Sequence, residues 1–211
     1  MRSYGQLCSV ARALDVVGDR WTLLIIRELI ICGQARFTDL QNGLPGIAPN
    51  LLAERLRSLQ EHGVLRNDLV PPPAMGSAYQ LTDRGRDLEG VVRELMKWGA
   101  PTVAGAPEDA DFQVHWLSLP VRYLLRDGRP DEAPTTIRFG DPRDGFDLTA
   151  GGGGTEVGPC QPEITPAVTV EGPGPALVRL IQGFVSLTEA AEAGITVTGD
   201  PSALQRVLPS R

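Results

Sequence analysis

The sequence has few cysteines and few histidines, and neither type is spaced as a metal site would require. Cys8, Cys32 and Cys160 are far apart in a chain of 211 residues. A disulfide scaffold and a structural zinc site are therefore not expected. The two histidines, His62 and His115, add no metal-ligand spacing. We expect no metal and no cofactor.

Long apolar runs are also missing. The longest run, residues 21–32, contains Thr22, Arg27 and Glu28 and is shorter than the ~20 residues that cross a bilayer. The N-terminus has no apolar segment followed by a cleavage site. Nucleophile elbows, P-loops and dinucleotide fingerprints are absent as well, so an enzyme is not expected. Together these absences predict a soluble cytoplasmic protein without a membrane partner.

An excess of basic charge is lacking too. Lys plus Arg number 20 and Asp plus Glu number 26, for a net charge of −6, which by itself argues against a nucleic-acid partner. The charge is uneven, however. Residues 1–100 carry 12 basic and 11 acidic side chains (net +1), and residues 101–211 carry 8 and 15 (net −7). With the proline- and alanine-rich segment 100–109, this predicts two domains, residues 1–104 and 105–211.

Apolar spacing predicts four helices early in the chain. Their approximate ranges are 10–17, 21–32, 39–41 and 49–62. Gly18 and Gly33 should end the first two, Thr38 should cap the third, and Pro49 suits the first position of the fourth. The first helix is expected to be amphipathic, and the second to be buried and central.

In the fourth helix, leucines recur on one face and polar residues on the other. Leu52, Leu56 and Leu59 follow at i, i+4 and i+7 and should face the core. The opposite face carries Asn50, Ala53, Glu54, Arg57 and Gln60.

A hairpin and a last helix follow. Two β-rich runs, 64–70 and 77–81, are joined by a proline-rich segment that favours a projecting tip. Thr82 and Asp83 predict the start of one long helix with apolar residues at helical spacing. This order of elements is that of a winged helix-turn-helix, whose second turn helix enters the DNA major groove.

Ordered motifs in residues 7–99 also resemble the HxlR family of bacterial regulators, relatives of the MarR group. The motifs are Trp21-Thr-Leu-Leu-Ile, Arg36-Phe-Thr-Asp-Leu-Gln, Leu44-Pro-Gly-Ile-Ala-Pro-Asn-Leu-Leu52 and Tyr79-Gln-Leu-Thr-Asp-Arg-Gly85. The resemblance implies a homodimer on a pseudo-palindromic double-stranded DNA operator, with the first and last helices of the domain at the interface. The chain departs from the family at Ala48, where members usually have Ser, and at a wing tip without charge.

We predict DNA contacts from the helix-turn-helix and the wing. The candidates are Arg36, Thr38, Pro49, Asn50, Ala53, Glu54, Arg55 and Arg57, with Pro73, Met75 and Ser77 in the wing. Arg55 and Arg57 would otherwise be solvated charges, and we expect at least one of them to contact DNA. Asn50 either reads adenine or supports the helix start. Arg36 and Thr38 could meet a phosphate.

Two of the cysteines receive separate predictions. Cys8 occupies the position that some relatives use for thiol redox sensing, and Arg12 could lower its pKa. The alternative is an inert small residue at the dimer interface. Cys32, on the buried helix, should be structural.

The second domain shows mixed α and β patterns. Short strands are predicted at 135–139, 145–149, 155–157, 167–170 and 195–198. Helices are predicted at 112–124, at 176–183, from Ser186 onward, and from Pro201 through Leu208.

Residues 112–208 resemble the sterol-carrier-protein fold, most strongly in the run from Val168 to Leu204, and the resemblance implies an α+β domain around an apolar-ligand pocket. The aromatic candidates for that pocket are Phe112, Trp116, Phe139, Phe146 and Phe184. Core packing explains the same residues equally well.

The sequence therefore predicts a mainly α winged helix-turn-helix domain followed by an α+β sterol-carrier-protein-like domain. We interpret the protein as a dimeric transcriptional repressor whose second domain senses an apolar small molecule. One alternative is a lipid or metabolite carrier with a vestigial helix-turn-helix. Another is a redox sensor acting through Cys8.

Overall fold

In the computed structural model the chain divides into two compact units, Met1–Pro101 and Thr102–Arg211. The structure describes residues 3–70, 76–103, 107 and 109–209. Within these ranges, none of the helices combines the length and apolar character needed to cross a bilayer. The same residues contain no group of three or more His, Cys, Asp or Glu side chains able to hold a metal.

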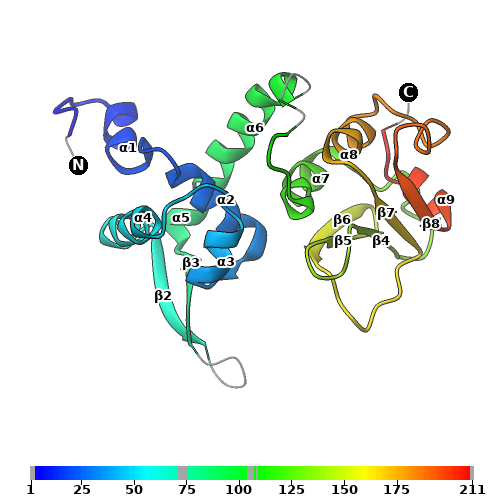
Figure 1. Ribbon diagram of the computed structural model, residues 1–211, viewed down its shortest axis with the longest axis horizontal. Helices are drawn as coiled ribbons and strands as arrows, with labels where there is room; N and C mark the ends of the chain where they lie inside the picture. Colours follow the sequence, from blue (N-terminus) through cyan, green and yellow to red (C-terminus); the bar gives the residue numbers. More distant parts are fainter. Residues whose placement is uncertain (1–2, 71–75, 104–106, 108, 210–211) are drawn as a thin grey trace. The chain divides into compact units, whose positions relative to one another are not determined.

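The first unit combines helices with a small antiparallel sheet (Figure 1). Its helices are α1 (Ser9–Val17), α2 (Thr22–Cys32), α3 (Phe37–Asn42), α4 (Pro49–Glu61), α5 (Asp83–Arg86) and α6 (Glu89–Val103). Its strands are β1 (Gln34–Ala35), β2 (Leu65–Val70) and β3 (Gly76–Leu81), in the order β1-β3-β2. The hairpin β2–β3 projects away from the helices of this unit (Figure 1).

The core of the first unit follows the apolar spacing of α2 and α4. Ile25, Ile26 and Leu29 of α2 are almost completely buried. Leu52, Leu56 and Leu59 of α4 are 0–1% exposed, which confirms that the predicted stripe faces the core. Gly33 ends α2 with a φ of 71°, a backbone conformation that glycine adopts without the steric penalty of a Cβ.

The N-terminal cap of α3 differs from the prediction. The helix α3 begins at Phe37, so Thr38 lies inside its first turn and is not the N-cap. Here the Arg36 backbone N–H donates to the Asp39 carboxylate at 2.9 Å. The carboxylate of Asp39, the third residue of the helix, thus accepts a hydrogen bond at the helix start, where the hydroxyl of Thr38 was predicted to form the cap.

The long helix predicted after Thr82 is interrupted. The Gly85 backbone N–H donates to the Thr82 hydroxyl at 3.1 Å, and the single turn of α5 ends before α6 begins at Glu89. The helix α6 then continues past Ala100, with Pro101 inside it. The segment predicted as a linker from residue 100 is therefore helical as far as Val103. The short strand β1 was not predicted.

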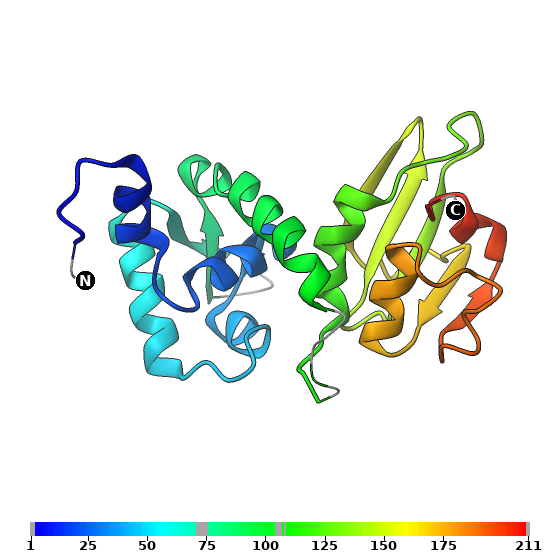
Figure 2. The ribbon, with the colours of Figure 1, turned by 90° about the horizontal axis from the view of Figure 1, so that it is seen from above.

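The second unit is a mixed sheet with helices, as the predicted α+β class requires (Figure 2). It contains a 3₁₀ helix η1 (Val114–Leu117), α7 (Ser118–Leu124), α8 (Gly174–Ile181), α9 (Pro201–Gln205) and the strands β4 (Thr135–Phe139), β5 (Phe146–Gly151), β6 (Gly154–Pro159), β7 (Val168–Glu171) and β8 (Thr196–Gly199). The strand order is β6-β5-β4-β7-β8. Strands β4 and β7 are parallel and the other neighbours are antiparallel.

Alternate residues of the central strands form the core of this unit. On each strand, side chains two residues apart share a face. Ile137, Leu148 and Val170 lie on such faces of β4, β5 and β7, and they are fully buried together with Leu177 and Leu180 of α8. In Figure 2, α8 lies in front of the strands.

A buried ion pair lies among the strand residues that alternate with the core positions. Arg138 donates from Nε and Nη2 to the two carboxylate oxygens of Asp147 at 2.7 and 2.8 Å. Its Nη2 also donates to the carbonyl oxygens of Gln161 and Ile164. Both charged residues are at most 7% exposed. This fork-to-fork geometry fastens β4 to β5 and both strands to the segment after β6.

Two predicted helices of the second unit are absent or shorter. The segment after Ser186 forms successive turns instead of an α-helix. The expected cap is nevertheless present, since the Ser186 N–H and hydroxyl donate to the Glu189 carboxylate at 2.8 and 2.7 Å. The final helix α9 ends at Gln205 and does not reach Leu208. Capping chemistry alone therefore does not make a helix when the following residues pack as turns.

Arg206 holds the end of α9 in place. Its guanidinium donates to both Asp127 carboxylate oxygens at 2.7 and 2.8 Å and to the Ala133 carbonyl oxygen at 2.8 Å. These bonds lower the pKa of Asp127 to about 2, the bond from Arg206 being the largest cause.

Candidate nucleic-acid interface

The helix α4 separates its apolar and polar residues cleanly. Opposite the buried leucines, Pro49, Asn50, Glu54 and Arg57 are exposed and Ala53 is half-buried. Pro49 occupies the first helical turn, where its missing N–H costs no hydrogen bond. The helix α4 thus presents Asn50 near its start, and Glu54 and Arg57 further along, to solvent, and exposed polar side chains on such a helix can read base edges in a major groove.

The two arginines of α4 differ in environment. Arg57 is exposed and has no ion pair within the described part of the chain. Arg55 is only 17% exposed, and its Nη1 lies 3.0 Å from Asp19 Oδ2 and 3.1 Å from Glu54 Oε1. Of the two predicted contacts, Arg57 is therefore open to a partner, and Arg55 is already engaged with the protein.

The start of α3 carries the next two predicted residues. Thr38 is exposed and Arg36 is half-buried. The guanidinium carbon of Arg36 would lie 3.9 Å from a Cβ placed on Gly76. Arg36 therefore brings a positive charge to the loop end of the paired strands of the hairpin β2–β3, where Gly76 pairs with Val70.

The hairpin itself offers little positive charge. Arg66, the one arginine in its two strands, lies 2.7 Å from Asp68, and Gln80 donates to the same carboxylate at 2.6 Å. Ser77 is exposed and stands opposite Leu69, which is 87% exposed. The predicted wing residues Pro73 and Met75 lie outside the described residues.

An exposed apolar surface covers parts of α1 and α6. We define it by Leu7, Val10 and Leu14 before and within α1 and by Val91, Leu95 and Trp98 of α6, which are 41–108% exposed. In α1 only Ala11 and Val17 are buried, so most of the apolar face predicted for this helix is left uncovered. Apolar side chains left exposed on two helices of one unit are candidates for burial against a partner.

The cysteine environments correct two predictions. Cys8 is exposed at the N-cap of α1, and the backbone N–H groups of Ala11 and Val10 lower its pKa. Arg12, expected to have that effect, instead faces Asp15 at 3.5 Å. Cys32 is an exposed residue and not a buried one. Although the residue is exposed, its thiol is partly desolvated, and this desolvation, with the nearby acidic charges of Glu28 and Asp39, raises its pKa to about 11.

The aromatic residues predicted to line a ligand pocket lie in different environments. Phe139 and Phe146 stack at 5.1 Å between ring centroids inside the core, and the Phe112 ring packs directly against Gly174. Trp116 is half-buried, and Phe184 is 66% exposed. Core packing, the alternative considered from the sequence, accounts for the positions of Phe139 and Phe146.

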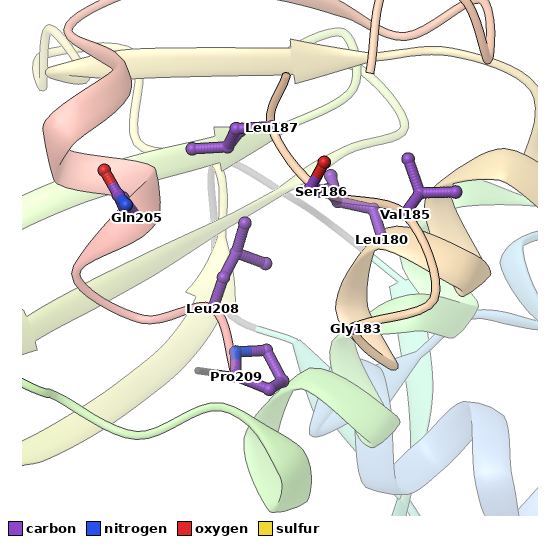
Figure 3. Close-up of a pocket in the computed structure, with 8 residues that line it drawn as sticks. All are labelled: Leu180, Gly183, Val185, Ser186, Leu187, Gln205, Leu208 and Pro209. Atoms are coloured by element: carbon purple, nitrogen blue, oxygen red, sulfur yellow. The ribbon is translucent and has the colours of Figure 1, made fainter. Parts of the chain in front are cut away.

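A different cavity is present near the end of the second unit. It has a volume of about 350 Å³ and is lined by Leu180, Gly183, Val185, Ser186, Leu187, Gln205, Leu208 and Pro209 (Figure 3). These residues come from α8, the turns after it, the end of α9 and the segment beyond α9. No local sequence pattern marks them, because the cavity depends on how the turns after α8 pack against the segment beyond α9.

The first unit thus has the elements and the exposed helix of a winged helix-turn-helix protein. The model of the HxlR-like helix-turn-helix family matches residues 16–105. The chain is 34% identical over 87 residues to the HTH-type transcriptional regulator YvaP of Bacillus subtilis (strain 168), covering 41% of this chain and 80% of YvaP. It is 34% identical over 96 residues to the HTH-type transcriptional regulator sll1512 of Synechocystis sp., covering 46% of this chain and 70% of that relative.

A solved structure gives a similar comparison. The reduced form of the transcriptional regulator YodB from B. subtilis is 28% identical, with a TM-score of 0.41, and the match covers 48% of this chain and 100% of YodB. On the sequence matches, the chain belongs to the HxlR-like helix-turn-helix family and is a DNA-binding transcriptional regulator. The family predicted from the sequence motifs is thereby confirmed. The match to the family model stops at residue 105.

Proposed function

We propose that the protein is a homodimeric repressor that places α4 of each copy in the major groove of a pseudo-palindromic operator. The observation that carries this proposal is the exposed face of α4, with Asn50, Glu54 and Arg57, opposite a fully buried leucine stripe. A helix with this division can enter the groove without uncovering its core.

Individual contacts follow from exposure. Asn50 and Arg57, which are exposed on α4, would reach base edges or phosphates, with Ala53 and Glu54 beside them. Thr38 and Arg36 at the start of α3, and Ser77 in the wing, would meet the DNA backbone. Phosphate contacts would set the register and base contacts the specificity.

The DNA contacts can be tested with a duplex that the wild-type protein selects from a randomised pool. Arg57→Ala should weaken binding by about 1–3 kcal/mol, measured by fluorescence anisotropy. Arg143→Ala is the matched control, because Arg143 is an exposed arginine of the second unit and its loss changes the net charge equally. If both variants bind like the wild type, α4 does not read this DNA.

In vitro transcription from a promoter overlapping the selected site should decrease when the protein is added, as a repressor requires.

We propose that the dimer forms through the exposed apolar surface on α1 and α6. Six large apolar side chains there are uncovered in the single chain, and their burial against a second copy would remove that surface from water. A twofold axis would present the two copies of α4 to successive half-sites of the operator.

We further propose that the second unit is a sterol-carrier-protein-like module whose cavity takes a small apolar ligand that modulates DNA binding. Its volume of about 350 Å³ and its mostly apolar lining support this proposal. A ligand can change DNA affinity only if it binds the two states of the protein with different affinity.

The ligand proposal can be tested with decanoate as the probe. Native mass spectrometry should detect one decanoate per protomer in the wild type and none in Leu208→Trp, in which the indole fills the cavity. Leu124→Trp, at an exposed site of α7, is the matched control. Ligand binding with no change in DNA affinity would favour a carrier role for this unit. No binding of decanoate or of any copurifying molecule would contradict the proposal.

A second candidate function is thiol sensing through Cys8. The thiol is exposed and its pKa is lowered by the backbone N–H groups at the start of α1, which raises the thiolate fraction available to an oxidant. Hydrogen peroxide should then change DNA affinity in the wild type and leave Cys8→Ser unaffected. Unchanged affinity in both proteins would contradict redox sensing.

A further inference from the structure

The loop between α1 and α2, residues 18–21, contacts α4 and the turn that leads into it. Asp19 Oδ2 lies 3.0 Å from Arg55 Nη1, near the middle of α4. The tip of the Trp21 ring would lie 3.9 Å from a Cβ on Gly46, three residues before α4 begins. One short loop therefore supports both the approach to this helix and its middle.

The conformation of this loop is tightly defined. Trp21 has a φ of 79° and is the one non-glycine residue with positive φ among those that the structure describes. The Arg20 guanidinium lies over its ring, 5.5 Å from the ring centre. A left-handed conformation in a large residue persists only where the surrounding contacts fix it. The loop can therefore serve as a fixed support for α4.

Arg55 lies on the flank of α4 between its core face and its solvent face. It follows Leu52 by three residues and precedes Leu59 by four, and both leucines are buried. Residues at these spacings are neighbours on a helix. Its Nε is buried without a hydrogen-bond partner. The guanidinium is thus turned into the protein, whereas Arg57 points to the opposite side and is exposed.

We infer that Arg55 is a positioning residue: through Asp19 it fixes how α4 is oriented on the α1–α2 loop, and it makes no contact with DNA. The leucine stripe anchors α4 along one line, and rotation about the helix axis would also break the contact on its flank. An ion pair on the flank restrains that rotation. The inference rests on the proposed placement of α4 in the major groove.

The test compares DNA affinity and its salt dependence for full-length variants on the duplex selected by the wild type. Arg55→Ala should weaken binding about tenfold while leaving the slope of log affinity against log salt unchanged, because no phosphate contact is lost. Arg55→Lys, which keeps a positive charge for Asp19, should recover most of the affinity. Arg57→Ala is the matched comparison and should lower the slope by about one if that arginine meets a phosphate.

Asp19→Ala gives the sharpest result. If Asp19 were merely a negative surface charge, its removal would strengthen binding to DNA. If it positions α4, its removal should weaken binding about tenfold, and the double variant Asp19→Ala/Arg55→Ala should lose no more than either single variant. Circular dichroism melting shows whether each variant is folded at the assay temperature. Asp19→Ala and Arg55→Lys still decide the question if Arg55→Ala is not folded.

Two results would overturn the inference. One is a salt slope lowered by about one in Arg55→Ala, which would make Arg55 a phosphate contact. The other is unchanged or tighter binding by Asp19→Ala. The failure of the proposed DNA interface is distinguishable from both, because it would appear as unchanged affinity and slope in Arg57→Ala.

Discussion

Replacing Trp98 by alanine should weaken the proposed dimer more than any other single truncation on the α1–α6 surface. The side chain belongs to α6 and is 81% exposed in the single chain. A tryptophan side chain can bury up to about 250 Å², so about 200 Å² of Trp98 is left to cover. At ~25 cal/mol per Å² this corresponds to about 5 kcal/mol per copy at full burial, an upper limit. Ordering costs and the retained Cβ reduce it, and we expect about 2–3 kcal/mol for the dimer, a roughly 30- to 150-fold rise in its dissociation constant.

Sedimentation velocity over a range of protein concentrations measures this change directly. Leu69→Ala is the matched control, because Leu69 is 87% exposed but lies on the hairpin β2–β3 and not on α1 or α6. The control should dimerise like the wild type. Equal dimer dissociation constants for Trp98→Ala and the wild type, or a wild type that stays monomeric at all concentrations, would refute the assignment of this surface to a dimer interface.

Two further predictions concern stability. Because the pKa of Asp127 is lowered to about 2 in the folded protein from an ordinary value of 3.8, the stability from its bond to Arg206 should be complete above about pH 4 and lost as the pH falls toward 2. Urea unfolding of the second unit at several pH values checks this, and Asp127→Asn should be less stable at pH 7 and less sensitive to acid. Gly85→Ala should destabilise the first unit by about 1–3 kcal/mol, because its Cβ would fall on the Val64 carbonyl oxygen. Gly90→Ala, with nothing within 4 Å of the new Cβ, should be neutral or stabilising in the same thermal melts, and equal melting temperatures for the two variants would contradict the steric argument.

Local chemistry explains which elements were predictable from the sequence. The stripe of Leu52, Leu56 and Leu59 was sufficient to orient α4, because helical spacing and burial agree there. The strand at 135–139 was predicted with the limits that β4 has, since Ile137 and Phe139 alternate with residues on the other face. The helix expected after Ser186 is absent, although its cap is formed. A capping motif stabilises only the first turn of a helix. Whether the helix continues depends on how the following residues pack in the tertiary structure.

The exposed residues of the candidate site were predictable from the sequence, but the ion-pair partners of its residues were not. Exposure of Asn50 and Arg57 followed from the helical wheel. The engagement of Arg55 did not, because its partner Asp19 lies 36 residues earlier in the chain and no local pattern joins the two. One signal was available: Arg55 stands three and four residues from buried leucines, which places it on the flank. The cavity in the second unit had no comparable signal, since its lining comes from separate segments.

The distribution of charge determines how such a protein can select DNA. The net charge of −6 is the sum of +1 over residues 1–100 and −7 over residues 101–211. Within the first part several cations are already paired: Arg55 with Asp19, and Arg66 with Asp68. The charge free to attract phosphates is therefore smaller than the residue count suggests. Because non-specific affinity depends on phosphate neutralisation, binding to random DNA should be weak. In the proposed dimer, selection would then depend on the polar residues of two α4 helices acting together, which is why the inferred orientation of α4 on the α1–α2 loop matters.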